Sequence, residues 1–212
     1  MRVVVGFKAH SGWAALVAIG GSGEETRVIE RRRIELAEPA TLAWAKQPYH
    51  TAHDLPPEEA RTLVDRGVES AHRVALQEMR GMAQRMANAG HEIIGCGIVS
   101  GPPLPPWTTE QILAVHIRMH KAEGALFPAA LARAAGACGL NPVLVQKQEL
   151  NSGDAHAPSP AAAARTLATL GKSVGPPWGA DQKSAALAAM IVLRQFSHRS
   201  SPKTGLNAPR ER

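Results

Sequence analysis

Three residues that could bind a metal ion or transfer a proton lie close together in the chain. They are His116, His120 and Glu123, spaced by four and then three residues. At about 100° per residue, a helix projects all three within roughly 60° of one another. Apolar residues share that arc, namely Ile112, Met119, Phe127 and Ala130. Burying a polar group unpaired costs on the order of 1–3 kcal/mol. The trio is therefore expected to be hydrogen-bonded, metal-bound or catalytic.

Three interpretations of the trio stay open. Two histidines four residues apart on a helix can bind one metal ion, with a carboxylate one turn further on. The pattern is not HExxH, because Ile117 stands where that motif has glutamate. No distant residue evidently completes a zinc site, although there are four candidates, so we assign no metal ligands: His10, His72, His156 and Asp181. The other two interpretations are a histidine–glutamate pair acting as general base or orienting a substrate, and a structural hydrogen-bond network.

A second group of polar residues follows the first apolar run of the chain. Lys8, His10 and Ser11 come directly after Val3–Phe7. A lysine that ends an apolar strand can anchor an anion, and the Ser11-Gly12 amides could cradle a phosphate. The alternative is a hairpin tip that is merely solvated.

The last predicted helix begins with Asp181 and Lys183. An acid in the first turn is favoured by the helix dipole and by capping alone. Lys183 lies about 200° around the helix from Asp181, so both reach one site only if the helix start is irregular. Nearby, Gly171-Lys172-Ser173 lacks the earlier glycine of a phosphate-binding loop, because Thr166 stands there.

The pattern of apolar residues predicts the elements that position these groups. Three strands form a meander over residues 2–8, 13–19 and 26–36, and further strands follow at 91–100 and 142–148. Helices are expected at 58–89, from Thr108 through the trio to about 136, at 161–170 and at 180–195. Thr108 and Gln111 make a capping box, and Pro128 is expected to kink the helix after the trio. Residues 38–57 are expected to be irregular, covering the sheet or forming a lid.

This order predicts a mixed five-stranded α/β sheet with helices on both faces. Strands joined through helices should run parallel to the first strand, and the second strand antiparallel to it. We expect a single domain over residues 1–198 and a basic, disordered tail over residues 199–212.

The element order resembles the ribonuclease H-like superfamily, which includes Holliday-junction resolvases and actin-type ATPase domains. Val5-Gly6-Phe7-Lys8-Ala9-His10-Ser11-Gly12 looks like its first hairpin, and Gly179-Ala180-Asp181-Gln182-Lys183 looks like the start of the final resolvase helix. The resemblance implies carboxylates on the first and fourth strands that hold two magnesium ions. Here those strands offer Lys8 and Ser100, and only Asp181 matches the pattern. An ordinary two-metal nuclease is therefore disfavoured.

Composition narrows the function classes further. The net charge is +6 in 212 residues and would suit a polyanionic partner, but part of the excess lies between Arg194 and Arg212. Arg31, Arg32 and Arg33 are expected to form a solvated strand face that protects a sheet edge. Neither Cys96 nor Cys138 belongs to a metal-ligand pair, and both are expected to be reduced core residues. No apolar run spans a bilayer and no signal peptide is evident, so we expect a cytoplasmic protein.

The leading hypothesis is a ribonuclease H-like domain that binds a nucleic acid or a phosphate-bearing small molecule, with no membrane partner and with a homodimer left open. Its predicted site has His120, Glu123 and Asp181 in catalytic positions and six ligand-binding residues: Lys8, His10, Ser11, Ser100, His116 and Lys183. The alternatives are a divergent single-metal nuclease or hydrolase using His120, Glu123 and Asp181, and a non-catalytic scaffold. No cofactor is assigned.

Overall fold

The computed structural model describes residues 1–21, 25–38, 42–151 and 158–199. Its centre is a sheet of five strands in the order β3-β2-β1-β4-β5. The strands are β1 (Arg2–His10), β2 (Trp13–Gly20), β3 (Arg27–Glu35), β4 (Glu92–Ser100) and β5 (Pro142–Gln146). Strand β2 is antiparallel to β1 and β3, whereas β4 is parallel to β1 and β5. The predicted meander followed by parallel strands is confirmed.

Strand β1 lies in the middle of the sheet and is covered on both faces. Val3, Val4 and Val5 are fully buried, which is why this strand shows a continuous apolar run rather than alternation. Edge strand β3 carries the three consecutive arginines. Arg32 and Arg33 are more than half exposed at this edge, as predicted, while Arg31 donates to the carbonyls of Gly175 and Pro177.

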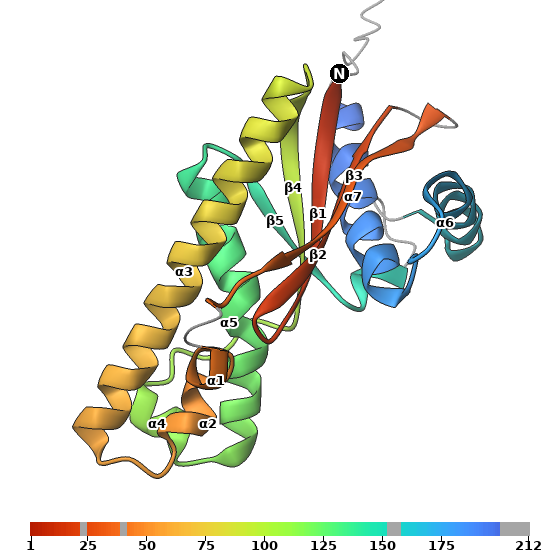
Figure 1. Ribbon diagram of the computed structural model, residues 1–212. Coiled ribbons are helices and arrows are strands. Elements are labelled where there is room, and N and C mark those ends of the chain that lie inside the picture. The colour runs from red at the N-terminus through yellow and green to blue at the C-terminus, as the bar shows by residue number, and fades with distance from the viewer. Residues whose placement is uncertain (22–24, 39–41, 152–157, 200–212) are drawn as a thin grey trace, which may run out of the picture.

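Helices cover the two faces of the sheet (Figure 1). Helices α3 (Pro57–Asn88) and α5 (His116–Ala137) pack together on one face, and α7 (Ala180–Arg199) packs on the other. Helix α6 (Pro160–Val174) contacts β3. No helix in the described part of the chain is long and apolar enough to cross a membrane.

Glycines in the central strands let α7 approach the sheet closely. A Cβ atom on Gly6 would lie 1.8 Å from the carbonyl oxygen of Ala185, and one on Gly97 would lie 2.6 Å from that of Ala188. Both contacts are with helix backbone, so neither position tolerates a side chain without moving the helix. This close packing holds the start of α7, including Asp181, against the end of β1.

The expectation that residues 38–57 are irregular is wrong for part of that segment. It contains two short helices, α1 (Leu42–Ala45) and α2 (Pro48–Ala52). They gather beyond one end of the sheet, with α4 (Thr109–Leu113) and the N-terminal parts of α3 and α5 (Figure 1). Pro48 at the first position of α2 supplies a helical φ, a local signal that outweighs the proline content of the segment.

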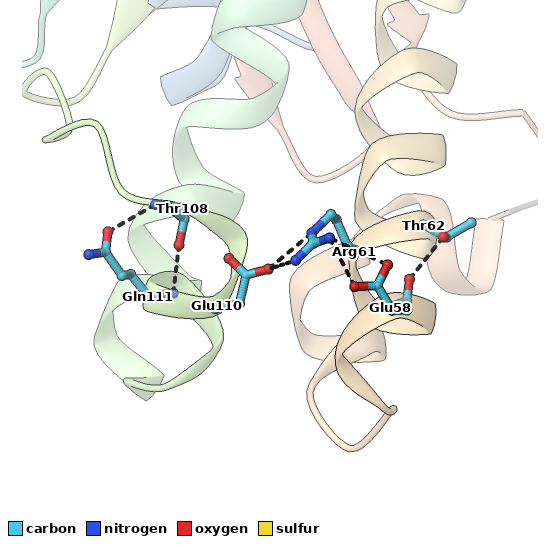
Figure 2. A network of polar contacts seen from close by, with 6 residues as sticks. All are labelled: Glu58, Arg61, Thr62, Thr108, Glu110 and Gln111. Atoms are coloured by element: carbon cyan, nitrogen blue, oxygen red, sulfur yellow. Dashed lines mark hydrogen bonds and ion pairs between the residues drawn. The ribbon is translucent and has the colours of Figure 1, made fainter.

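The trio's helix also starts later than predicted. The capping box at Thr108 and Gln111 is present, but it begins the short helix α4. The chain then leaves helical geometry at Val115, which has φ −140° and ψ 114°, and α5 begins at His116. Helix α4 is linked to α3 through Arg61, which bonds to both Glu110 and Glu58 (Figure 2).

The other predicted helices are found with shifted ends. Helix α6 extends four residues past the predicted Leu170, and α7 continues through Arg199. Arg199 is thus helical rather than part of a disordered tail, whereas residues 200–212 lie outside the described residues. Helix α5 passes through Pro128 without ending and stops before Cys138, and Gly139 then adopts a φ of 74°.

Candidate functional site

A cavity of about 740 Å³ lies where β1 and β4 end. Because the two strands are parallel and pair Lys8 with Val99, Lys8 and Ser100 reach the same edge of the sheet. The segment 101–107 and helix α5 form further walls. Five residues predicted for the site line this cavity, which we call the strand-end cleft: Lys8, His10, Ser11, Ser100 and Glu123.

Three lysines line the strand-end cleft. Lys8 comes from β1, Lys121 from α5, and Lys147 follows β5. The backbone N–H of Lys147 donates to the carbonyl of Ser100 at 3.2 Å, which holds this residue beside the end of β4. Lys121 and Lys147 were not predicted as site residues. Lys121 lies one position from His120, and Lys147 follows a short apolar run, as Lys8 does.

Lys8 is only partly exposed, and its Nζ donates to the carbonyl of Ala9 at 3.1 Å. Burial lowers the pKa of Lys8, the charge of Lys147 lowers it further, and the charge of Asp181 acts in the opposite direction. The two lysines are therefore close enough for their positive charges to repel each other. An anion bound between them would remove that repulsion.

His10 is held by contacts on two sides. Its Nε2 donates to Asp181 Oδ1 at 2.7 Å, and its ring stacks on Trp13 with centroids 4.5 Å apart. The Arg33 guanidinium lies 4.0 Å from the centroid of the same Trp13 ring. Asp181 thus reaches the cleft through His10. A histidine oriented by a carboxylate is an arrangement suited to accepting a proton.

Glu123 is the buried member of the predicted trio, with 6% of its surface exposed. One oxygen, Oε1, accepts hydrogen bonds from the backbone N–H groups of Tyr49 at 2.9 Å and His50 at 3.3 Å. These belong to the first turn of α2, whose N-cap residue Gln47 makes no side-chain capping bond. A carboxylate from α5 therefore caps α2.

Burial raises the pKa of Glu123 to about 7, although the hydrogen bonds from His50 and Tyr49 act to lower it. Its second oxygen, Oε2, is buried and has no hydrogen-bond partner among the described residues. Glu123 forms no ion pair with Lys8 of the cleft, because Lys8 Nζ donates to the carbonyl of Ala9 and the carboxylate accepts from the backbone of α2. The positive end of the α2 dipole therefore faces this carboxylate.

His116 and His120 lie elsewhere than expected. Both are exposed rather than set in the buried face, because they occupy the first turns of α5, beyond the sheet. Their Nε2 atoms are 2.9 Å apart. His50 of α2 joins them, and the three residues offer nitrogen atoms that all lie within 4.8 Å of one another. We call these three residues the histidine cluster.

His50 was missed from the sequence. It lies in a segment predicted to be irregular, 66 residues before His116, so no spacing rule connects the two. The helix start at Pro48 is a signal for local structure, but the partner on α5 follows only from the tertiary fold.

The remaining predicted residues, Asp181 and Lys183, lie at two different places in the fold. Asp181 contacts His10 and is not part of the histidine cluster, so the predicted catalytic set of His120, Glu123 and Asp181 does not converge on one point. Lys183 lines a different cavity, beside Lys172 and Trp178.

The residues at the strand ends do not suit a pair of magnesium ions. Magnesium requires several hard oxygen ligands, and β1 and β4 present Lys8 and Ser100 here. Of the two carboxylates close to these strand ends, Asp181 is bound by His10, and Glu123 accepts hydrogen bonds from the backbone of α2. The strand ends therefore lack the set of free carboxylates that two-metal hydrolysis requires.

Comparison with protein-family models finds no match, and no curated protein matches the sequence. Two solved structures of Thermus thermophilus RuvC are similar to this fold. One, RuvC in complex with a Holliday junction substrate, has a TM-score of 0.50 and 11% identity, covering 93% of this chain and 96% of that chain. The other has a TM-score of 0.50 and 13% identity with the same coverage. RuvC is a resolvase with a ribonuclease H-like fold, so the likeness confirms the predicted fold class, a mixed five-stranded sheet with helices on both faces.

Proposed function

We propose that this ribonuclease H-like chain binds a phosphate-bearing ligand, and specifically nucleic acid, in the strand-end cleft. The observation that carries the proposal is the convergence of Lys8, Lys121 and Lys147 from three separate elements on one cavity. Lys8 and Lys147 repel each other, which lowers the pKa of Lys8 beyond the effect of burial. Phosphate oxygens placed between such cations gain charge-assisted hydrogen bonds.

The structural neighbours support nucleic acid as the ligand class. One of the RuvC structures was solved with a Holliday junction substrate. The present chain has a fold of the same kind, and its cleft lies at the end of the central strands. A net charge of +6 adds long-range attraction for a polyanion. The likeness itself is of fold, so the lysines of this chain carry the argument for binding.

Fluorescence anisotropy with a labelled four-way DNA junction, a duplex and a single strand tests the proposal. Affinity is expected to fall steeply between about 50 and 200 mM salt, because each neutralised phosphate of duplex DNA contributes about 0.9 to the salt slope. Lys8→Met and Lys147→Met should each weaken binding roughly fivefold and flatten the slope by about 0.9. Arg80→Met removes the same charge from an exposed position of α3 outside the cleft and should have little effect.

Binding that is insensitive to salt, or equally sensitive to Arg80→Met and Lys8→Met, contradicts the proposal. If no nucleic acid or phosphate-bearing ligand binds while the fold is intact, the scaffold interpretation is favoured instead.

Hydrolysis of the bound nucleic acid is a second candidate, favoured by the 2.7 Å hydrogen bond between His10 and Asp181. A base oriented in this way could activate water at the cleft. The experiment is a cleavage assay on the same labelled substrates with wild type, His10→Ala and Asp181→Asn. Loss of cleavage with retained binding in both variants supports hydrolysis, whereas unchanged cleavage in both assigns it to a contaminant or another site.

A further inference from the structure

The histidine cluster joins two distant parts of the chain at a place outside the strand-end cleft. His50 comes from α2, whereas His116 and His120 come from the first turns of α5. The ring centroid of His50 lies 4.7 Å from that of His120 and 5.5 Å from that of His116. Neither His50 nor His116 lines the strand-end cleft.

One buried ring nitrogen in the cluster has no hydrogen-bond partner among the described residues. His116 and His120 contact each other through their Nε2 atoms at 2.9 Å. Nδ1 of His50 faces Glu123 Oε1 at 3.4 Å. The nitrogen without a partner is Nε2 of His50, which is buried. A buried polar atom without a partner is costly, so its retention calls for a ligand.

We propose that His50, His116 and His120 bind one divalent transition-metal ion, with Zn²⁺ as the representative. Neutral imidazole nitrogen is a preferred ligand of zinc and of neighbouring transition metals. Zinc–nitrogen bonds of about 2.0–2.1 Å place ligand atoms within the separations that the cluster already spans, after small side-chain adjustments.

Glu123 acts in this site as a positioning residue. Its carboxylate accepts bonds from the His50 backbone N–H at 3.3 Å and faces the His50 ring at 3.4 Å. A carboxylate behind a ligating histidine fixes the tautomer and the orientation of the ring. It directs Nε2 of His50 toward the metal, while the metal itself is held by the three imidazoles.

The exposure of His116 and His120 gives the metal an open side. Three protein ligands leave the fourth position of a tetrahedral ion to water or to a ligand. The site also joins α2 to the start of α5, which are far apart in sequence. Metal binding should therefore stabilise the fold as well as provide an accessible metal centre.

Titration of tag-free, chelator-treated protein with Zn²⁺ by calorimetry, and with Co²⁺ by visible absorption, tests the site. Wild type is expected to bind one ion per chain, to show the intense absorption of four-coordinate Co²⁺ and to gain thermal stability with Zn²⁺. His116→Ala and His120→Ala should each lower the affinity at least tenfold and abolish the thermal shift. Both residues are exposed, so these variants should fold, which circular dichroism checks.

His53→Ala is the matched control, because His53 is exposed and follows α2 without joining the cluster. It should bind zinc as wild type does. Glu123→Ala should lower the zinc affinity tenfold or more and alter the Co²⁺ spectrum, with Glu123→Gln intermediate. Sub-stoichiometric zinc in wild type, or equal losses in His53→Ala and His120→Ala, would overturn the proposal. The nucleic-acid experiment depends on lysine variants and can be repeated in chelator, so either proposal can fail without the other.

Discussion

Glu123 lies where the two candidate sites meet. It lines the strand-end cleft, and it also holds the backbone of His50 in the histidine cluster. Burial raises the pKa of Glu123 to about 7, because desolvation disfavours the ionised carboxylate. The Glu123 side chain caps α2, although Glu123 lies 74 positions after Tyr49 in the chain.

Replacing Glu123 by alanine should therefore remove the cap of α2 and destabilise the fold. Two N–H groups of its first turn lose their acceptor, at roughly 1–3 kcal/mol for each buried donor left unpaired. We expect the free energy of unfolding to fall by about 2–4 kcal/mol in urea titrations with chelator present. Glu123→Gln keeps an oxygen acceptor and should lose less than half of that amount. Equal losses in the two variants would show that the carboxylate does not act as a cap.

The two cysteines should differ in reactivity. Cys96 is fully buried in β4, and burial raises its thiol pKa to about 12, whereas Cys138 at the end of α5 is partly exposed. The thiolate is the reactive form, so iodoacetamide near pH 8 should modify Cys138 alone in the native protein. Mass spectrometry should find one adduct before denaturation and two after it. Two adducts on the native chain would contradict the burial of Cys96.

At the scale of elements, the position of α2 depends on a close contact with α3. A Cβ atom on Gly67 would lie 2.5 Å from Cβ of Pro48, a rigid ring at the start of α2. Gly81, on the same helix, has room for a methyl group, with its nearest neighbour 3.5 Å away on the flexible Arg85 side chain. Alanine substitutions at these two glycines therefore distinguish the effect of helix propensity from the effect of packing between α2 and α3.

Gly81→Ala should raise the free energy of unfolding by up to about 1 kcal/mol, the usual gain for alanine over glycine in a helix. Gly67→Ala should not raise the free energy of unfolding in this way, because the added methyl group displaces α2. It should also weaken zinc binding, since α2 carries His50. Urea unfolding and zinc calorimetry on the two variants check this. The expectation fails if both variants are stabilised alike and bind zinc alike.

The elements also show what the sequence could and could not predict. Apolar periodicity located all five strands and the long helices, because each buries a continuous face. It overlooked α2, since a five-residue helix gains its stability from α3 and from Glu123 rather than from its own pattern. It also placed His116 and His120 on a buried face, since periodicity does not tell where a helix projects past the sheet.

At the scale of the whole molecule, the cleft and the C-terminal residues are two separate groups of positive charge. The cleft has Lys8, Lys121 and Lys147. Residues 200–212 hold three basic residues against one acidic residue, so their removal lowers the net charge from +6 to +4. Both groups attract a polyanion, and the cleft also offers a cavity in which its lysines can bind one.

A chain ending at Arg199 should separate the two contributions. If the cleft binds nucleic acid, the shortened chain keeps its affinity within about threefold of the full chain, and Lys8→Met still weakens it roughly fivefold. A full-length variant with Lys203, Arg210 and Arg212 changed to glutamine controls for chain length and should match the shortened chain. Anisotropy titrations at several salt concentrations measure all four proteins. Loss of binding on truncation, with no remaining effect of Lys8→Met, would assign the affinity to the C-terminal residues and leave the cleft without a nucleic-acid ligand.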